Sequence, residues 1–293
     1  MKMKLAGPLL LTLMSMGKAE ASSWLFDANP SLTQGTYSGS IERSSLTDRG
    51  IKVSASYLDQ GAITVGYSRT LVAMKTAPTI DQDNWLLSGH FNRYLDSGHG
   101  RLSFRLDGYR LNNNDFVGQT GGVTTIAPQV SWLSNDGMLY ADLGYARSGY
   151  QNALTVQQYT PTAGFGLNGG NDWIQFRAFL IRGLNPLRAE GKSATTGADA
   201  KWTHYFAAGS PLKPSSVSLG ISLGEKIYAV DMDAMSVANL ADLQRGGETV
   251  GLGWKISRDA KLFALAGQMR YTNTQIANDY RLNVGYVDLS FDW

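Results

Sequence analysis

Apolar and polar residues alternate with a period of two along most of the chain, from about residue 34 to residue 293. The alternation is clearest in the segments 50–58, 101–109, 138–147, 173–180, 216–224 and 249–257. Successive side chains of an extended strand point to opposite faces, so this period is typical of β-strands that have one apolar and one polar face. The helical spacing of apolar residues is not the dominant signal.

About fourteen such strands can be counted, and the same pattern allows twelve to sixteen. Most are close to the 9–11 residues with which a tilted strand crosses a membrane. The predicted spans are 34–43, 50–58, 61–73, 84–95, 101–112, 123–134, 138–150, 156–168, 172–184, 194–206, 215–228, 247–257, 261–273 and 280–293.

The lengths of the connections between these strands also alternate. Short turns are predicted at 59–61, 96–100, 134–137, 168–172 and 257–260, and longer loops at 71–83, 112–122, 151–155, 185–193, 229–246 and 274–279. The connection 207–215 is a mild exception. Short periplasmic turns and longer external loops are typical of an all-β, antiparallel up-and-down transmembrane barrel. A soluble exported sandwich or propeller also alternates, but it does not account for this asymmetry.

Composition supports a sheet in a membrane. Charged residues make up 17% of the chain, below the roughly 25% of soluble domains, and there are 33 glycines and no cysteine. After the first segment no apolar run reaches about 20 residues, which excludes helical spans. A sheet can cross hydrocarbon only if it closes on itself, because every backbone N–H and C=O there needs a partner.

The N-terminal segment 1–21 has the features of a secretory signal peptide: a basic start, an apolar stretch and a small-x-small cleavage site. Its removal takes the basic and acidic counts from 26 and 24 to 23 each, so the charge gives no indication of nucleic-acid binding. Residues 22–33 are predicted to be a periplasmic N-terminal segment, and they could serve as a tail, a plug or a partner contact. The barrel is predicted to occupy 34–293.

The segment NVGYVDLSFDW (283–293) combines the alternation with aromatic residues. It resembles the C-terminal recognition strand of bacterial outer-membrane β-barrel proteins. That resemblance implies a location in the bacterial outer membrane and contact with its lipid. It also implies an assembly signal at Tyr286, Leu289, Phe291 and Trp293, read by the barrel-assembly machinery. The size and strand number look like a monomeric porin, and a looser similarity connects the chain to barrels of exopolysaccharide export.

The polar faces of the strands suggest what the barrel does. Barrels of about 16–18 strands enclose an aqueous channel, so about fourteen strands favour a water-filled pore. The expected pore-lining residues are Lys52, Arg101, Arg105, Asp107, Asp142, Arg177, Asp199, Lys201, Lys255, Arg270 and Asp288. Seven are basic and four acidic, which predicts passive diffusion of small hydrophilic solutes with a weak preference for anions and without a cofactor.

The loop 229–246 is the longest, and three interpretations of it stay open. Asp231 and Asp233 could begin a Ca²⁺ site, but the rest of a known ligand loop is missing, so no metal site is predicted. The loop could instead stay on the surface, or it could fold into the lumen and narrow it.

Two other functions are weighed against a channel. An enzyme would need a histidine near a hydroxyl or carboxylate, and none of His90, His99 and His204 has a neighbourhood that fits, so no catalytic residue is predicted. The other alternative is a barrel that exports or anchors a surface polysaccharide together with periplasmic partners.

Overall fold

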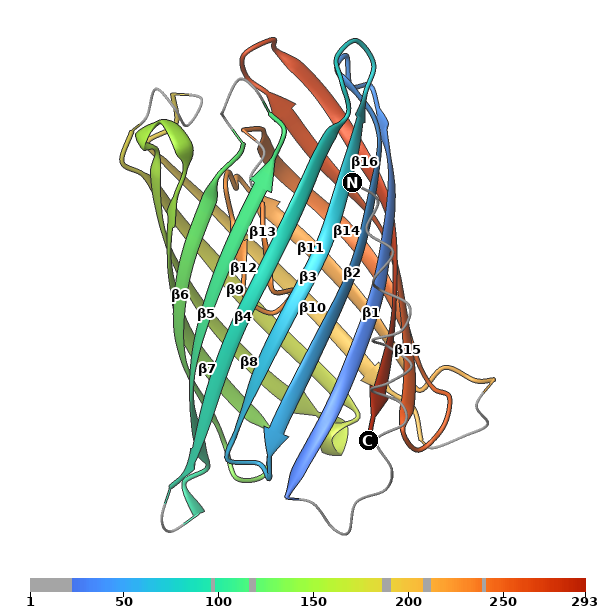
Figure 1. The fold of residues 1–293 in the computed structure, drawn as a ribbon. Helices are drawn as coiled ribbons and strands as arrows, with labels where there is room; N and C mark the ends of the chain where they lie inside the picture. The colour runs from blue at the N-terminus through green and yellow to red at the C-terminus, as the bar shows by residue number, and fades with distance from the viewer. Residues whose placement is uncertain (1–22, 96–97, 116–119, 186–190, 208–211, 239–240) are drawn as a thin grey trace.

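The computed structural model describes residues 23–95, 98–115, 120–185, 191–207, 212–238 and 241–293. The predicted signal peptide lies outside the described residues. Fourteen antiparallel strands follow one another in chain order and close into a barrel in which β1 pairs with both β2 and β16 (Figure 1). The predicted fold class and strand number are confirmed. Within the described residues, no helix is long and apolar enough to cross a membrane.

The barrel strands and the small elements between them have the following bounds. They are β1 (Trp24–Ser38), β2 (Arg43–Tyr57), β3 (Gly61–Met74), β4 (Ile80–Tyr94), β5 (Arg101–Asn113), β6 (Val123–Leu133), β7 (Leu139–Gly149), η2 (Gln151–Ala153), β8 (Thr155–Leu167), η3 (Asn168–Gly170), β9 (Asp172–Gly183), β10 (Ala194–Tyr205), β11 (Ser216–Gly224), β12 (Val230–Asp231), β13 (Ser236–Val237), β14 (Leu243–Lys255), β15 (Ala260–Asn273) and β16 (Asn278–Asp292).

The first strand begins earlier than the alternation predicts. Residues 24–33, expected to form a periplasmic segment, belong to β1, where Trp24 lies opposite Tyr57 of β2 and Asp27 opposite Asp292 of β16. Asn29 and Pro30 obscure the pattern, because both residue types are depleted in strands. Pro30 has no N–H to donate, and the pairing with β16 omits these two positions while the pairing with β2 continues through them.

Several strands also extend further into the predicted loops. β3 runs to Met74 and β4 starts at Ile80, although 71–83 was expected to be a loop. The added residues continue the hydrogen-bonded pairing, as Thr70 opposite Gln82 shows. The run 81–83 of β4 is polar on both faces and the run 71–74 of β3 is apolar on both faces, so neither alternates and the sequence does not reveal that the strands continue.

The two faces of the barrel wall have opposite character. The outward face carries exposed apolar side chains such as Leu87, Leu106 and Leu143, whereas Asp107, next to Leu106, is fully buried on the inward face. An apolar exterior around a polar interior is the arrangement that a closed sheet needs in hydrocarbon. The barrel is therefore built to span a membrane, with the connections β1–β2, β3–β4 and β11–β14 at one end.

Candidate functional site

The connection between β11 and β14 folds into the barrel instead of extending away from it. Its short hairpin of β12 and β13 is drawn inside the ring of strands (Figure 1). Tyr228, Val230 and Met232 are almost completely buried, and they pack against inward-facing residues of β4 to β9. Of the three interpretations of this loop, the structure therefore supports folding into the lumen. We call residues 225–238 the inward hairpin.

A buried amide holds the backbone of the inward hairpin to β8. The Gln158 side chain is fully buried; its Nε2 donates to the Val230 carbonyl at 2.6 Å, and its Oε1 accepts from the Val230 N–H at 2.9 Å. On the next strand, a Cβ added at Gly144 would lie 2.5 Å from Cε of Met232. A glycine here therefore lets the hairpin approach the wall closely.

Two arginines of the wall bind the tip of the inward hairpin. Arg177 donates from Nη1 to Asp231 at 3.0 Å and from Nη2 to Asp233. Arg105 donates to the Met232 carbonyl at 2.7 Å and forms an ion pair with Asp107. The carboxylates suggested as the start of a Ca²⁺ site thus bind a guanidinium, and one oxygen of Asp231 also accepts two backbone N–H bonds within the hairpin.

Further contacts hold the two ends of this connection. Lys226 donates to Asp199 at 2.8 Å and lies 4.4 Å from the ring centre of Phe179, and its backbone pairs with Gln244. At the other end, Asp242 pairs with Arg43 and accepts from the Tyr280 hydroxyl at 2.7 Å. These contacts fix the two ends of the connection that carries the inward hairpin.

The structure brings some of the predicted pore-lining residues together at the inward hairpin: Arg105, Asp107 and Arg177 at its tip, and Asp199 at its base. Among the residues that the structure describes, the other predicted ones on the inward face make no ion pair with the inward hairpin, and they differ in how far they are buried. Lys201 and Lys255 are exposed, Lys52, Arg101 and Asp288 are half-buried, and Asp142 is buried.

One predicted pore-lining residue lies on the wrong face. Arg270 of β15 is opposite Arg281 of β16 and forms an ion pair with Glu248 of β14 at 3.7 Å, all three being exposed. Its neighbours Met269 and Tyr271 take the inward positions, packing beside the inward-facing Tyr280. The prediction failed because the inward positions beside Arg270 carry the apolar Met269 and Tyr271, so at this strand end the polar set faces outward.

Sequence reasoning missed Gln158, Arg43, Lys226 and Asp242, all buried and all in contact with this connection or its ends. Gln158 lies in the predicted strand 156–168, but it has no charge and so was not selected. Arg43 and Lys226 lie near the ends of predicted strands, and Asp242 lies in a predicted loop. Gln157 and Gln158 are both polar, so the alternation is interrupted there and gave no signal for Gln158.

The residues of the predicted assembly signal divide between the two faces. Leu289, Phe291 and Trp293 belong to the outward set, whereas Tyr286 alternates with them and shares a face with Asp288. Trp293 pairs with Phe26 of β1 through two backbone hydrogen bonds of 2.9 Å, and the two rings stack with centroids 6.3 Å apart. These contacts extend the seam at which β1 and β16 close the barrel.

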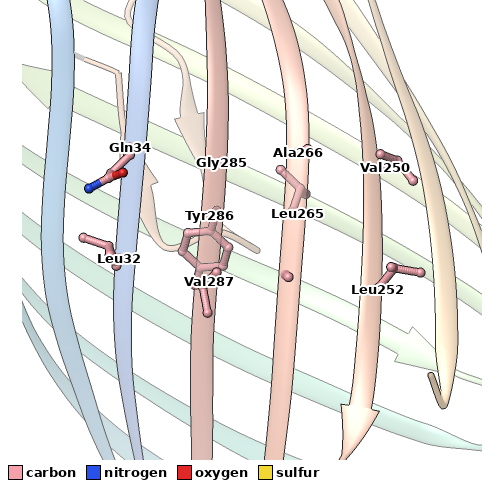
Figure 2. Close-up of a pocket in the computed structure, with 10 residues that line it drawn as sticks. Leu32, Gln34, Val250, Leu252, Leu265, Ala266, Gly285, Tyr286 and Val287 are labelled. Carbon is pink, nitrogen blue, oxygen red and sulfur yellow. The ribbon is translucent and has the colours of Figure 1, made fainter. Parts of the chain in front are cut away.

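A shallow apolar depression lies on the wall beside that seam. Leu32, Val250 and Val287 project around the small residues Gly285 and Ala266 of neighbouring strands (Figure 2). The exposed fractions of Leu32, Val250 and Val287 place them on the outward face. The depression is therefore part of the lipid-facing surface and separate from the lumen.

Comparisons with known proteins agree on the fold. No protein family model matches the chain, and no curated protein matches it. Among solved structures, the CymD monoaromatic hydrocarbon channel superposes with a TM-score of 0.52 at 7% identity, covering 93% of this chain and 89% of that one. The outer membrane protein Omp33 of Acinetobacter baumannii has a TM-score of 0.47 at 10% identity over 92% and 99% of the two chains. The NanC porin has a TM-score of 0.45 at 11% identity over 89% and 98%.

A closed antiparallel barrel with an apolar exterior and a polar interior defines a class of protein, the outer-membrane β-barrels. Among the three solved structures, the CymD monoaromatic hydrocarbon channel has a TM-score above 0.5, and that likeness supports the barrel fold.

Proposed function

We propose that the protein is an outer-membrane channel through which small hydrophilic solutes diffuse passively. The observation that carries the proposal is the inward hairpin, which Arg105, Gln158 and Arg177 hold against one side of the inner wall. Barrels of about 16–18 strands leave an aqueous channel, and fourteen strands come close to that width. A hairpin fixed to one side narrows such a passage and gives it a charged lining.

We further propose that this passage weakly prefers anions. Arg43, Arg105, Arg177 and Lys226 are paired with carboxylates, which neutralises much of their charge. Lys201 and Lys255 are exposed on the inward face and have no carboxylate within 4 Å in the described part of the chain. Free ammonium groups along a passage attract anions, and the field of a paired group is weaker.

Refolded protein in a planar bilayer of neutral lipid tests both statements. We expect steady single-channel currents and, in a KCl gradient, a reversal potential that indicates an anion-to-cation permeability ratio of about 2. In the variant Lys201→Gln/Lys255→Gln the ratio should fall to about 1 with the conductance nearly unchanged. Arg93→Gln/Arg258→Gln is the matched control, because these two charges lie on the outward face and in a turn.

The two statements fail in different ways. Cation selectivity in the unaltered protein would contradict the anion preference and leave the channel intact. A protein that folds and inserts but gives no current would contradict the channel itself and favour a barrel that works with periplasmic export partners.

We also propose that the barrel-assembly machinery inserts this barrel and recognises the strand β16. The alternation of outward Leu289 and Phe291 with inward Asp288 and Ser290 supports this proposal, as does the position of β16 at the closing seam. The consequence for assembly is developed below for Trp293.

A further inference from the structure

Eight arginines lie on the outward face of the barrel near its loop end. Each is exposed and lies within the seven residues of its strand that are nearest to the loops: Arg49 (β2), Arg69 (β3), Arg110 (β5), Arg147 (β7), Arg182 (β9), Arg245 (β14), Arg270 (β15) and Arg281 (β16). We call this set the arginine belt. Among the described residues, the opposite end has only Arg93 in an outward strand position.

The register of the sheet places members of the arginine belt beside one another. Arg49 lies directly opposite Arg69, and Arg270 directly opposite Arg281. Gln157 of β8 lies opposite Arg147 on one side and opposite Arg182 on the other. Like charges directly across a sheet are destabilising, so this arrangement favours an anionic counterpart.

Within the described residues, carboxylates of the protein itself pair with only some of the arginines in the belt. Asp81 pairs with Arg69, Glu225 with Arg245 and Glu248 with Arg270. In the part of the chain that the structure describes, Arg147 and Arg182 have no carboxylate within 4 Å, and neither do Arg49 and Arg281. Arg147 and Arg182, with Gln157 between them, form a patch on three consecutive strands in which neither arginine is paired with a carboxylate of a described residue.

Below this patch, toward the middle of the barrel, the outward side chains change from arginine to tyrosine and then to leucine. Tyr145 and Tyr159 lie opposite each other two residues below Arg147 and Gln157, with ring centroids 5.1 Å apart. Leu180 of β9 lies opposite Tyr159, and Leu143 of β7 follows two residues below Tyr145; both leucines are about half exposed. Tyrosine rings belong at the level of lipid headgroups and leucines at the level of acyl chains.

We propose that Arg147 and Arg182 bind the phosphate group of a lipid of the outer leaflet, above Gln157. Neighbouring strands are about 4.8 Å apart, so the backbones of Arg147 and Arg182, with β8 between them, are separated by about 10 Å, a distance over which two long side chains can reach one phosphate. Guanidinium groups bind phosphate oxygens through paired, charge-assisted hydrogen bonds. The occupant is a lipid and not free phosphate, because the tyrosines and leucines below the arginines continue the contact along the headgroup and its acyl chains.

The experiment measures lipid retention by native mass spectrometry. The purified full-length protein is exchanged into detergent and mixed with equal amounts of bis-phosphorylated lipid A and its dephosphorylated form. We expect the unaltered protein to retain the phosphorylated form preferentially. In Arg147→Gln/Arg182→Gln that preference should fall about tenfold. The control Arg93→Gln/Arg258→Gln removes the same charge elsewhere and should keep the preference.

A second measurement separates the lipid from a free anion. Inorganic phosphate at millimolar concentration should not displace the retained lipid; displacement at low millimolar concentration would show an anion site and overturn the proposal. Equal retention of both lipid A forms, or full retention by the double variant, would also overturn it. A gel shift on heating checks that each variant is folded. Because neither residue faces the lumen, channel currents should stay unchanged.

Discussion

Replacing residues 227–241 with a short Asn-Gly turn is expected to increase the single-channel conductance by at least about threefold. The replacement removes Tyr228, Val230 and Met232 from the interior and leaves β11 and β14 joined at the end of the barrel. Conductance rises with the cross-section of the narrowest part of a pore. The measurement is single-channel recording of refolded protein in a planar bilayer.

A point substitution tests the same idea without changing the chain length. Arg177→Gln removes the ion pairs to Asp231 and Asp233, so the hairpin tip should move and the current should fluctuate between levels. Arg182→Gln is the matched control, because it removes the same charge from the other face of the same strand. The buried amide of Gln158 still holds Val230 in both variants, so a complete loss of the hairpin is not expected.

The outcome that would contradict this account is a deletion variant that folds and has the conductance of the unaltered protein. Such a result would mean that the narrowest part of the passage lies elsewhere, and that the inward hairpin stabilises the wall without restricting flow.

Deleting Trp293 is expected to reduce the fraction of protein that reaches the folded, membrane-inserted state by about tenfold, with little effect on conductance. The deletion removes both backbone hydrogen bonds to Phe26 and the stacked ring at the seam of β1 and β16. Backbone groups without a partner are costly next to hydrocarbon, so an unfinished seam should slow closure. Heat-modifiability on gels measures the folded fraction, and planar bilayer recording measures the conductance.

Two substitutions distinguish the ring from the backbone. Trp293→Phe keeps an aromatic ring and both hydrogen bonds and should assemble nearly normally. Trp293→Ala keeps only the hydrogen bonds and should give an intermediate result. Trp254→Ala on β14 is a control for the loss of a tryptophan away from the seam. Unchanged surface levels of the deletion variant would show that Trp293 is not needed for assembly.

The period-two alternation, together with the alternating lengths of the connections, predicted the class of fold and a number of about fourteen strands. Leu102, Phe104 and Leu106 alternate with Arg101, Arg105 and Asp107 because lipid lies on one side of this strand and polar groups on the other. The signal fails where the sheet leaves the hydrocarbon: Asp81, Gln82 and Asp83 are strand residues of β4, although three consecutive polar residues show no alternation. It also fails at Pro30, whose residue type argues against a strand that nevertheless forms.

The functional site was predicted only in part for a related reason. Arg105, Asp107, Arg177 and Asp199 were selected as inward charges, and all four contact the inward hairpin or are paired beside it. Arg270 was selected by the same criterion and lies outside, in the arginine belt. Alternation assigns a residue to one of two sets, and near the loops the set that faces inward here is apolar, as Met269 and Tyr271 show.

The sequence by itself determined that this chain forms a closed transmembrane barrel, because a membrane imposes a period of two on every strand that crosses it. Only the tertiary structure decided what occupies the interior and what surrounds the outer rim. The inward hairpin depends on Gln158, Arg105 and Arg177, which stand on three different strands, and the arginine belt depends on the relative register of eight. Contacts between strands far apart in the chain leave no local pattern in the sequence.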